Sequence, residues 1–317
     1  MTGIAKTNRP LIGAALMLAI LLIAPHLFYP VFLMKVLCFA LFACAFNLLL
    51  GYVGLLSFGH AAFFGSAGYI TAHAVKVLNF SPILGILLGV AVSSLLGLVI
   101  GWLAIRRSGI YFAMITLGFA QVVYFLSLQL PFTGGEDGIQ GVPRGTLFGL
   151  VDLRDTMSMY YFVLVIFLCG FWLVYRTINS PFGQVLKAIR ENEPRARSLG
   201  YDTDRFKLMA FVISAGLSGL AGGTKSLVFQ LASLTDVNWH MSGEVVLMTL
   251  LGGMGTVLGP AVGALLVVTL NNYLAGFGSW VTIIIGVIFV SCVLAFRRGI
   301  VGEVMEKVRI WNSKDSR

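Results

Sequence analysis

The stretch VVLMTLLGGMGTVLGPAVGALLVVTL, residues 245–270, is apolar at both ends and interrupted in its middle. The interruption consists of residues that break helices, namely Gly252, Gly253, Gly255, Gly259 and Pro260. In a membrane such residues are tolerated only where surrounding protein or a cavity shelters the backbone groups that they free. The stretch therefore predicts a broken or hairpin element enclosed by other membrane helices.

The composition of the whole chain is that of a protein in a lipid bilayer. Of the 317 residues, 58% are hydrophobic and 11% are charged, and the mean hydropathy is +0.92. Soluble globular domains carry roughly 25% charged residues. Because a spanning helix uses about 20 apolar residues, we expect an all-α integral membrane protein with about 8–10 membrane segments and broken or re-entrant helices. These segments leave little of the chain for a catalytic domain.

Apolar blocks recur along the sequence and are separated mostly by short connectors. They cover residues 11–29, 31–50, 54–75, 83–105, 110–130, 157–177, 207–231, 245–275 and 280–296. Each block is long enough to be helical in lipid, where the backbone must satisfy its own hydrogen bonds. We expect one transmembrane domain over residues 1–317.

The distribution of charge predicts the orientation of this domain. Lys and Arg gather at the N-terminus, at Arg106 and Arg107, and in the 176–207 region and the C-terminal tail. Basic segments stay on the cytoplasmic side of a membrane. We therefore expect a multi-pass membrane protein with both termini cytoplasmic. Its parts are an external loop at 131–156, a cytoplasmic loop at 178–206 and a cytoplasmic tail at 297–317. The net charge of +9 needs no nucleic-acid partner.

Counting crossings supports the hairpin. If blocks 207–231, 245–275 and 280–296 each crossed once from the cytoplasm, the basic tail would lie outside. One of them must be split or re-entrant, and 245–275 is the best candidate.

An internal sequence repeat points to a second break. Residues 49–54 read LLGYVG and residues 250–255 read LLGGMG. Glycine-rich helices produce such matches by chance, but paired broken segments in two halves are typical of a transporter's central site. The residues of a translocation path predicted on this basis are Ser57, Gly59, His60, Gly255 and Thr256.

Polar residues within the apolar blocks have two interpretations. His60 either faces the path or makes a hydrogen bond between packed helices. The amide of Asn47 either lines a path or, as the safer interpretation, bonds between helices. Small residues around Gly65 predict close helix contact.

The basic loop predicts a short amphipathic helix. Ser180 and Pro181 form a start signal, and Phe182, Val185, Leu186 and Ile189 recur with helical spacing. Pro194 ends this helix and starts a second turn, Arg195 to Leu199, which Gly200 caps. Asp202 or Thr203 caps the next membrane helix. Such a helix either rests among lipid headgroups or docks into a groove of a cytosolic partner.

The same loop carries a family resemblance. GQVLKAIRENEPRARSLGYDTDRFKLMAFVISAGLSGLAG, at 183–222, resembles permease subunits of branched-chain amino acid ABC importers of the LivM type. GYVGLLSFGHAAFFGSAGYITA (51–72), SGIYFAMITLGFAQV (108–122), FTGGEDGIQGVP (132–143) and LLGGMGTVLGPAVGA (250–264) match in the same order. The general permease loop signature is present only loosely, as Glu193, Ala196 and Gly200.

The resemblance implies a type II-like importer permease in which residues 181–200 contain the coupling helix. The implied ATPase-coupling residues are Gly183, Lys187, Arg190, Glu191, Asn192, Glu193 and Gly200. The implied partners are two cytosolic ABC ATPase subunits, a second homologous permease subunit, a periplasmic amino-acid-binding protein and the lipid bilayer. The implied substrates are leucine, isoleucine and valine.

We expect this chain to bind no cofactor and no metal, with ATP and Mg on the partner subunits. The segment GLAGGTKS at 219–226 fails as a phosphate loop because Thr224 separates its last glycine from Lys225. The sequence shows no spacing of a metal cluster or a catalytic set, which argues against a membrane enzyme.

Two alternatives remain. One is a permease of the same family for urea or another small amide or amino acid. The other is an ion-coupled secondary transporter, against which we note no carboxylate placed clearly within a span. Asp236, His240 and Glu244 are expected outside, on a solvated face or against a binding protein.

Overall fold

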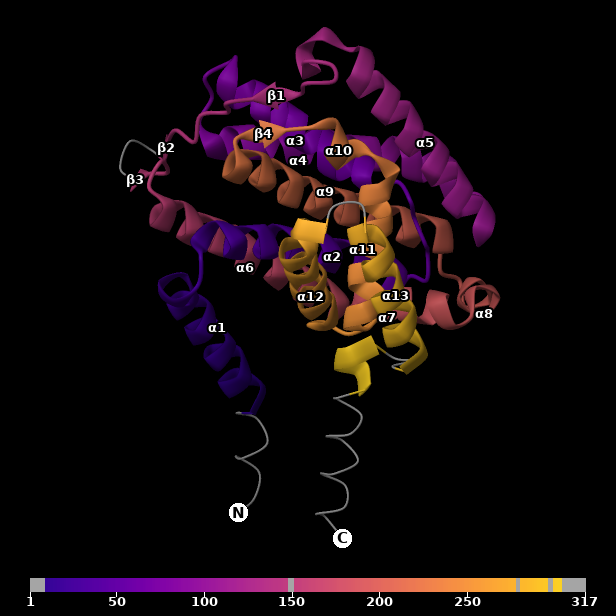
Figure 1. Ribbon diagram of the computed structural model, residues 1–317. Coiled ribbons are helices and arrows are strands. Elements are labelled where there is room, and N and C mark those ends of the chain that lie inside the picture. Colours follow the sequence, from indigo (N-terminus) through magenta and orange to yellow (C-terminus); the bar gives the residue numbers. More distant parts are fainter. Residues whose placement is uncertain (1–8, 148–150, 278–279, 296–298, 304–317) are drawn as a thin grey trace.

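The protein is a helical bundle, described by a computed structural model over residues 9–147, 151–277, 280–295 and 299–303 (Figure 1). The apolar helices are α1 (Arg9–Leu27), α2 (Pro30–Tyr52), α3 (His60–Lys76), α4 (Pro82–Ala104), α5 (Ile110–Gln129), α6 (Thr156–Ile178), α9 (Thr203–Phe229), α11 (Trp239–Gly252), α12 (Gly259–Leu274) and α13 (Trp280–Ala295). Within the described residues, α2, α4, α5, α6 and α9 are long and apolar enough to cross a membrane. The expected all-α integral membrane architecture is confirmed.

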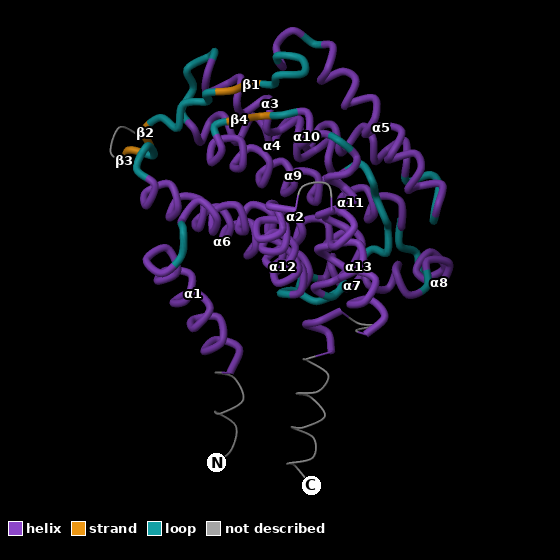
Figure 2. The backbone as a smooth tube through the Cα atoms, viewed as in Figure 1, coloured by secondary structure: helices purple, strands orange, loops and turns teal. Residues whose placement is uncertain are grey.

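Short elements connect these helices (Figure 2). They are η1 (Pro131–Thr133), β1 (Ile139–Gln140), β2 (Thr146–Leu147), β3 (Val151–Asp152), α7 (Pro181–Glu191), α8 (Glu193–Ser198), β4 (Leu231–Ala232), α10 (Leu234–Val237) and η2 (Ala275–Phe277). In Figure 1, α7 and α8 lie at one end of the bundle, the α7 end, and β1 and β4 at the other.

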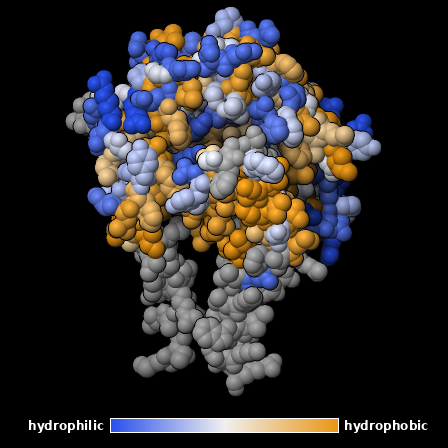
Figure 3. Space-filling view, viewed as in Figure 1, coloured by the Kyte–Doolittle hydropathy of each residue, from blue (hydrophilic) through white to orange (hydrophobic). Residues whose placement is uncertain are grey.

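Burial separates central helices from peripheral ones. The apolar windows of α2 and α9 are 83% and 67% buried, whereas those of α4, α5 and α6 are 33%, 28% and 39% buried. The peripheral helices expose large side chains such as Leu95 and Trp102 on α4 and Trp172 on α6. Apolar side chains also gather over α12 and α13 in Figure 3. Exposed apolar surface of this extent suits contact with lipid tails.

Small residues bring the central helices together. A Cβ added to Gly222 on α9 would overlap the carbonyl of Phe64 on α3, and one on Gly65 would lie 2.8 Å from the backbone nitrogen of Val237. Membrane helices use such residues for close approach because lipid provides no hydrophobic drive between helices. The packing role predicted for the small residues near Gly65 is confirmed.

The interrupted stretch forms the expected hairpin. The chain leaves α11 at Gly252 and enters α12 at Gly259, so residues 253–258, the second break, are not helical. A Cβ on Gly263 would overlap the carbonyl of Met248, which shows that the two helices run back along each other. Gly299, beyond α13, lies against Gly253. The chain therefore returns to the α7 end, as the crossing count required, although most of the predicted 297–317 tail lies outside the described residues.

The predicted apolar block at 54–75 is wrong at its start. Residues 53–59, the first break, are not helical, and α3 begins at His60. Gly54 has a φ of +81°, a left-handed conformation that favours glycine. The Phe58 N–H donates to the Thr116 hydroxyl at 3.1 Å, so a neighbouring helix satisfies backbone that a continuous helix would have paired internally.

The glycine-rich 131–156 loop covers the opposite end. β1 pairs with β4, Arg144 donates to the Val228 carbonyl at 2.8 Å, and Lys76 donates to the Gln140 carbonyl at 2.6 Å. Asp155 caps α6, and the hydrogen bonds from the Ser158 backbone and hydroxyl hold the pKa of this carboxyl below its ordinary value. The loop is thus attached to the ends of three helices.

Candidate functional site

The side chain of Asn47 on α2 binds the second break. Its Nδ2 donates to the Thr256 carbonyl at 2.8 Å, and its Oδ1 accepts from the Gly255 N–H at 2.9 Å. Non-helical backbone at membrane depth needs such partners. The interpretation that Asn47 makes hydrogen bonds between helical elements is confirmed. The two repeat segments, 49–54 and 250–255, lie in contact.

Glycine allows this contact. A Cβ on Gly51 would lie 2.6 Å from the backbone nitrogen of Gly255, and Gly255 itself has a φ of +77°. Both positions exclude a side chain, the first by close approach and the second by conformation. The end of α2 and the second break therefore form one tightly packed junction.

Arg190 on α7 reaches this junction. Its Nη1 donates to the carbonyl of Gly51, a Cβ on Gly255 would lie 3.2 Å from the same nitrogen, and one on Gly54 would lie 3.1 Å from the Arg190 Cγ. Lys187, one turn earlier, lies 5.7 Å from the ring centre of Tyr52. A cation at the last carbonyls of α2 is favoured by the helix dipole. One short helix thus contacts both breaks.

The local structure of α7 follows from its sequence. Ser180 accepts a hydrogen bond from the Gly183 N–H at 3.3 Å, and Pro181 begins the helix. Leu186 and Ile189 are buried, so the predicted amphipathic helix is confirmed. A Cβ on Gly183 would lie 2.5 Å from the Thr177 carbonyl oxygen. Gly183 therefore holds α7 against the end of α6.

The second predicted turn begins earlier than expected. Asn192 caps α8 by accepting from the Arg195 N–H at 3.0 Å, so α8 starts at Glu193 and includes Pro194 in its first turn. Proline fits there because its missing N–H has no helical partner to lose. Gly200 has the predicted left-handed conformation, with a φ of +89°.

Glu193 links α8 to α9 through an ion pair. Its carboxylate pairs with Lys207, whose side chain is only 5% exposed, and lies 3.5 Å from Arg197. Asp202 caps α9 through the Arg205 N–H, as predicted. Glu193 therefore has a structural contact within this chain.

The outer surface of α7 and α8 is open. Glu191 is exposed at the end of α7, Leu199 is 70% exposed and Tyr201 is 42% exposed. A shallow groove of about 570 Å³ runs beside α7 and is lined by Asn179, Ser180, Pro181, Gln184, Val185, Ala188 and Tyr201. Apolar side chains bordered by charges are typical of a docking surface.

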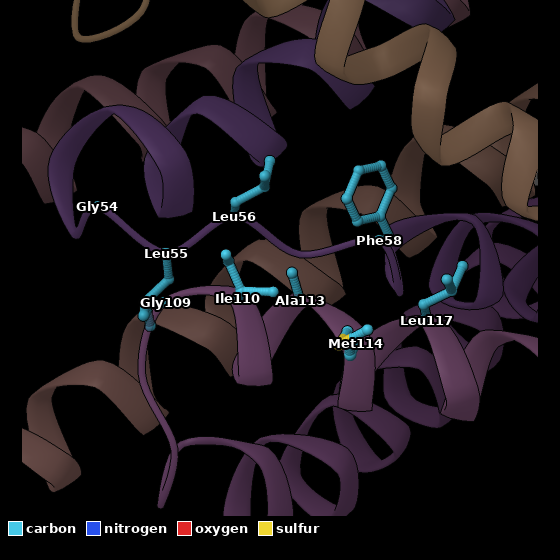
Figure 4. Close-up of a pocket in the computed structure, with 9 residues that line it drawn as sticks. All are labelled: Gly54, Leu55, Leu56, Phe58, Gly109, Ile110, Ala113, Met114 and Leu117. Atoms are coloured by element: carbon cyan, nitrogen blue, oxygen red, sulfur yellow. The ribbon is translucent and has the colours of Figure 1, made fainter.

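The predicted path residues of the first break are enclosed by protein. Ser57 is fully buried and accepts from the Gly59 N–H at 3.2 Å. A Cβ on Gly59 would lie 3.2 Å from the Thr116 carbonyl oxygen. On its other side the break borders an apolar groove of about 420 Å³ against the start of α5, and Leu56 and Met114 are among the residues that line it (Figure 4).

His60 takes part in helix packing. Its Nε2 lies 2.8 Å from the hydroxyl of Ser214, which donates in turn to the Ala45 carbonyl at 2.6 Å. The rings of Phe46, Phe63 and Phe211 surround it. The hydrogen bond that the sequence left open is present, and a role for His60 in translocation stays a prediction.

The sequence interpretation missed a buried ion pair. Lys225 Nζ lies 2.6 Å from both carboxylate oxygens of Asp236, and their side chains are 13% and 8% exposed. The expectation that Asp236 lies on a solvated face is wrong, because the 233–238 segment turns inward against α3. The sequence did contain a signal for this pair, because Lys225 and Asp236 have opposite charges, are eleven positions apart, and the lysine stands in an apolar stretch.

We predict that breaking this pair is costly. Lys225→Met leaves Asp236 buried without its partner, which destabilises a protein by about 3–5 kcal/mol. The double variant Lys225→Met with Asp236→Leu removes both charges and should recover most of the loss. Thermal unfolding of the purified protein in detergent measures both. Equal midpoints for the single and double variants would contradict the prediction.

The fold defines a multi-pass integral membrane protein. The chain belongs to the family described as "Branched-chain amino acid transport system / permease component", whose family model matches residues 30–293. The family resemblance in the sequence is thereby confirmed.

Individual relatives that the chain is similar to are also described as permease proteins. The chain is 28% identical over 294 residues to the high-affinity branched-chain amino acid transport system permease protein LivM of Escherichia coli K12, covering 84% of this chain and 68% of that protein. It is 28% identical over 256 residues to the probable LivM of Methanocaldococcus jannaschii, covering 69% and 73%. It is 30% identical over 196 residues to the autoinducer 2 import system permease protein LsrC of Salmonella typhi, covering 60% and 53%. No solved structure matches the chain.

Proposed function

We propose that this permease imports branched-chain amino acids across the bacterial inner membrane, driven by ATP hydrolysis on partner subunits. The observation that carries the substrate class is the extent of similarity. The match to LivM covers 84% of the chain, whereas the match to LsrC covers 60%. Urea and other small amides or amino acids remain the alternative within the family.

The complex has the composition implied by the resemblance. Two cytosolic ABC ATPase subunits hold ATP and Mg, a second homologous permease subunit completes the membrane part, and a periplasmic binding protein delivers the amino acid. In this arrangement the α7 end, with the termini and Arg106, faces the cytoplasm, and the 131–156 loop faces the periplasm. The basic residues at the α7 end support this orientation.

Coupling runs through α7 and α8. The exposed surface with Leu199 and Tyr201 docks on an ATPase subunit, where Glu191 and Gly200 are also accessible. When the ATPase subunits close, α7 shifts as a rigid body and Arg190 transmits the shift to the ends of α2 and α11 at the two breaks. The path residues Ser57, Gly59, His60, Gly255 and Thr256 border or form these breaks.

Reconstitution in liposomes tests the function. The complete complex, supplied with binding protein and ATP, should accumulate labelled leucine, and omitting the ATPase subunits should abolish accumulation. Leucine uptake by this chain without ATPase subunits would favour the secondary transporter. Uptake of urea with no uptake of leucine, isoleucine or valine would favour the alternative substrate.

A further inference from the structure

A cavity of about 430 Å³ lies between α2, α9, α10, α11 and α12, and Leu231 of β4 contributes to its rim. It therefore lies toward the end of the bundle opposite α7. Four charged side chains line it: Lys35, Lys225, Asp236 and Glu244. Charged groups in a membrane domain are costly and mark functional sites by default.

Two of the four charges neutralise each other. Lys225 contacts both oxygens of Asp236 at 2.6 Å, and the Ser233 hydroxyl lies 3.4 Å from the same carboxylate. This pair is a wall of the cavity with little capacity for a further ligand.

Lys35 on α2 and Glu244 on α11 are different. Both are half-buried, and among the described residues neither side chain forms an ion pair or a hydrogen bond. They carry opposite charges, face one cavity and stand on neighbouring helices. A half-buried charge without a partner carries a desolvation cost. A ligand with one positive and one negative group would offset both costs at once.

The rest of the cavity wall suits an aliphatic group. Phe39, Met248 and Val268 line it beside the two charges, and Asn271 adds one amide. Small-molecule sites typically have about 300–1,000 Å³, mostly apolar walls and a few placed polar groups. This cavity has the size and the lining of such a site.

We propose that the cavity binds the zwitterion of an aliphatic amino acid. The Glu244 carboxylate accepts from the α-ammonium group, the Lys35 ammonium donates to the α-carboxylate, and the side chain rests on Phe39, Met248 and Val268. The inference rests on the proposed function, because it assigns the residues with which the permease receives its substrate. It requires both charges on the ligand, which urea lacks.

Protection of an engineered cysteine tests the site in the complete importer. In a chain whose Cys38, Cys44, Cys169 and Cys292 are replaced by serine, Met241→Cys places a thiol in the cavity wall. The rate of its modification by a small membrane-impermeant methanethiosulfonate is measured. Leucine at about ten times its Kd should slow the modification roughly ten-fold by mass action. 4-Methylpentanoate, which lacks the amine, and 3-methylbutylamine, which lacks the carboxylate, should not.

Charge variants then assign the contacts. Lys35→Met and Glu244→Gln should each raise the leucine concentration needed for protection about ten-fold or more, and Lys35→Arg should retain protection. The matched control is Lys76→Gln, which removes a lysine charge at the same end of the bundle but outside the cavity lining and should leave protection intact. Tyr273→Cys, 78% exposed near the end of α12, should react equally with and without leucine.

Leucine uptake measured in parallel distinguishes a failure of the proposed binding site from a failure of the proposed function. If the importer accumulates leucine but leucine does not protect the Met241→Cys thiol, the site is wrong and the proposed function stands. Equal protection by 4-methylpentanoate, or unchanged protection in Lys35→Met and Glu244→Gln, would also overturn the site. If no branched-chain amino acid is accumulated, the proposed function fails, and protection by leucine alone then decides the site.

Discussion

Arg190→Ala should uncouple ATP hydrolysis from transport. The variant removes a charge-assisted hydrogen bond to the Gly51 carbonyl, worth about 1.5–3 kcal/mol, at the point where α7 contacts both breaks. Movement of α7 would then no longer reach the ends of α2 and α11. We expect leucine uptake to fall roughly ten-fold or more while the ATPase activity of the complex persists.

The ratio of ATP hydrolysed to leucine accumulated in liposomes measures this effect. Arg190→Lys keeps the charge but not the planar fork, so it should give an intermediate ratio. Arg107→Ala is the control, since Arg107 is an exposed arginine that follows α4, outside the 178–206 loop. A normal ratio in Arg190→Ala, with normal assembly, would show that coupling bypasses this contact.

Gly263→Val should prevent the hairpin from forming. A Cβ at this position overlaps the Met248 carbonyl and lies 2.8 Å from the backbone nitrogen of Gly252. The obstacle is backbone of the facing helix, which cannot move aside as a flexible side chain can. Overpacking of this kind costs roughly 3 kcal/mol or more, a large part of a domain's stability of about 5–15 kcal/mol. We expect a severe loss of folded protein, measured as monodisperse yield after detergent extraction.

Gly243→Ala is the matched control on the same hairpin. A Cβ on Gly243 of α11 meets nothing within 4 Å, and alanine is favoured over glycine inside a helix by about 1 kcal/mol. Its yield should equal or exceed that of the unaltered chain. Equal yields of Gly263→Val and Gly243→Ala would mean that α11 and α12 do not pack as described.

Local features of the coupling loop could be predicted from the sequence because they depend on neighbouring residues. Ser180, Asp202 and Gly200 cap helix ends through short-range backbone contacts. The start of α8 was misplaced by two residues, since both Asn192 and Pro194 are good start signals and only the folded loop selects between them. Such errors lie within one turn of a helix.

The partners of polar side chains could not be predicted in the same way. Lys225 stands in an apolar helix and Asp236 in a polar segment, and their contact arises because the segment folds inward. In the same way, the sequence alone did not place the buried Asp236 of α10 and Glu244 of α11 beside one cavity.

The sequence by itself determined the membrane class, the order of the apolar helices and the position of the second break. Apolar length, glycine and proline act locally, and lipid forces each apolar run to satisfy its own backbone. Only the tertiary structure decided that Asn47 binds the second break, that Arg190 reaches both breaks, and that Lys35 and Glu244 face one cavity. These residues are far apart in the sequence, and their geometry depends on how closely glycines let the helices approach.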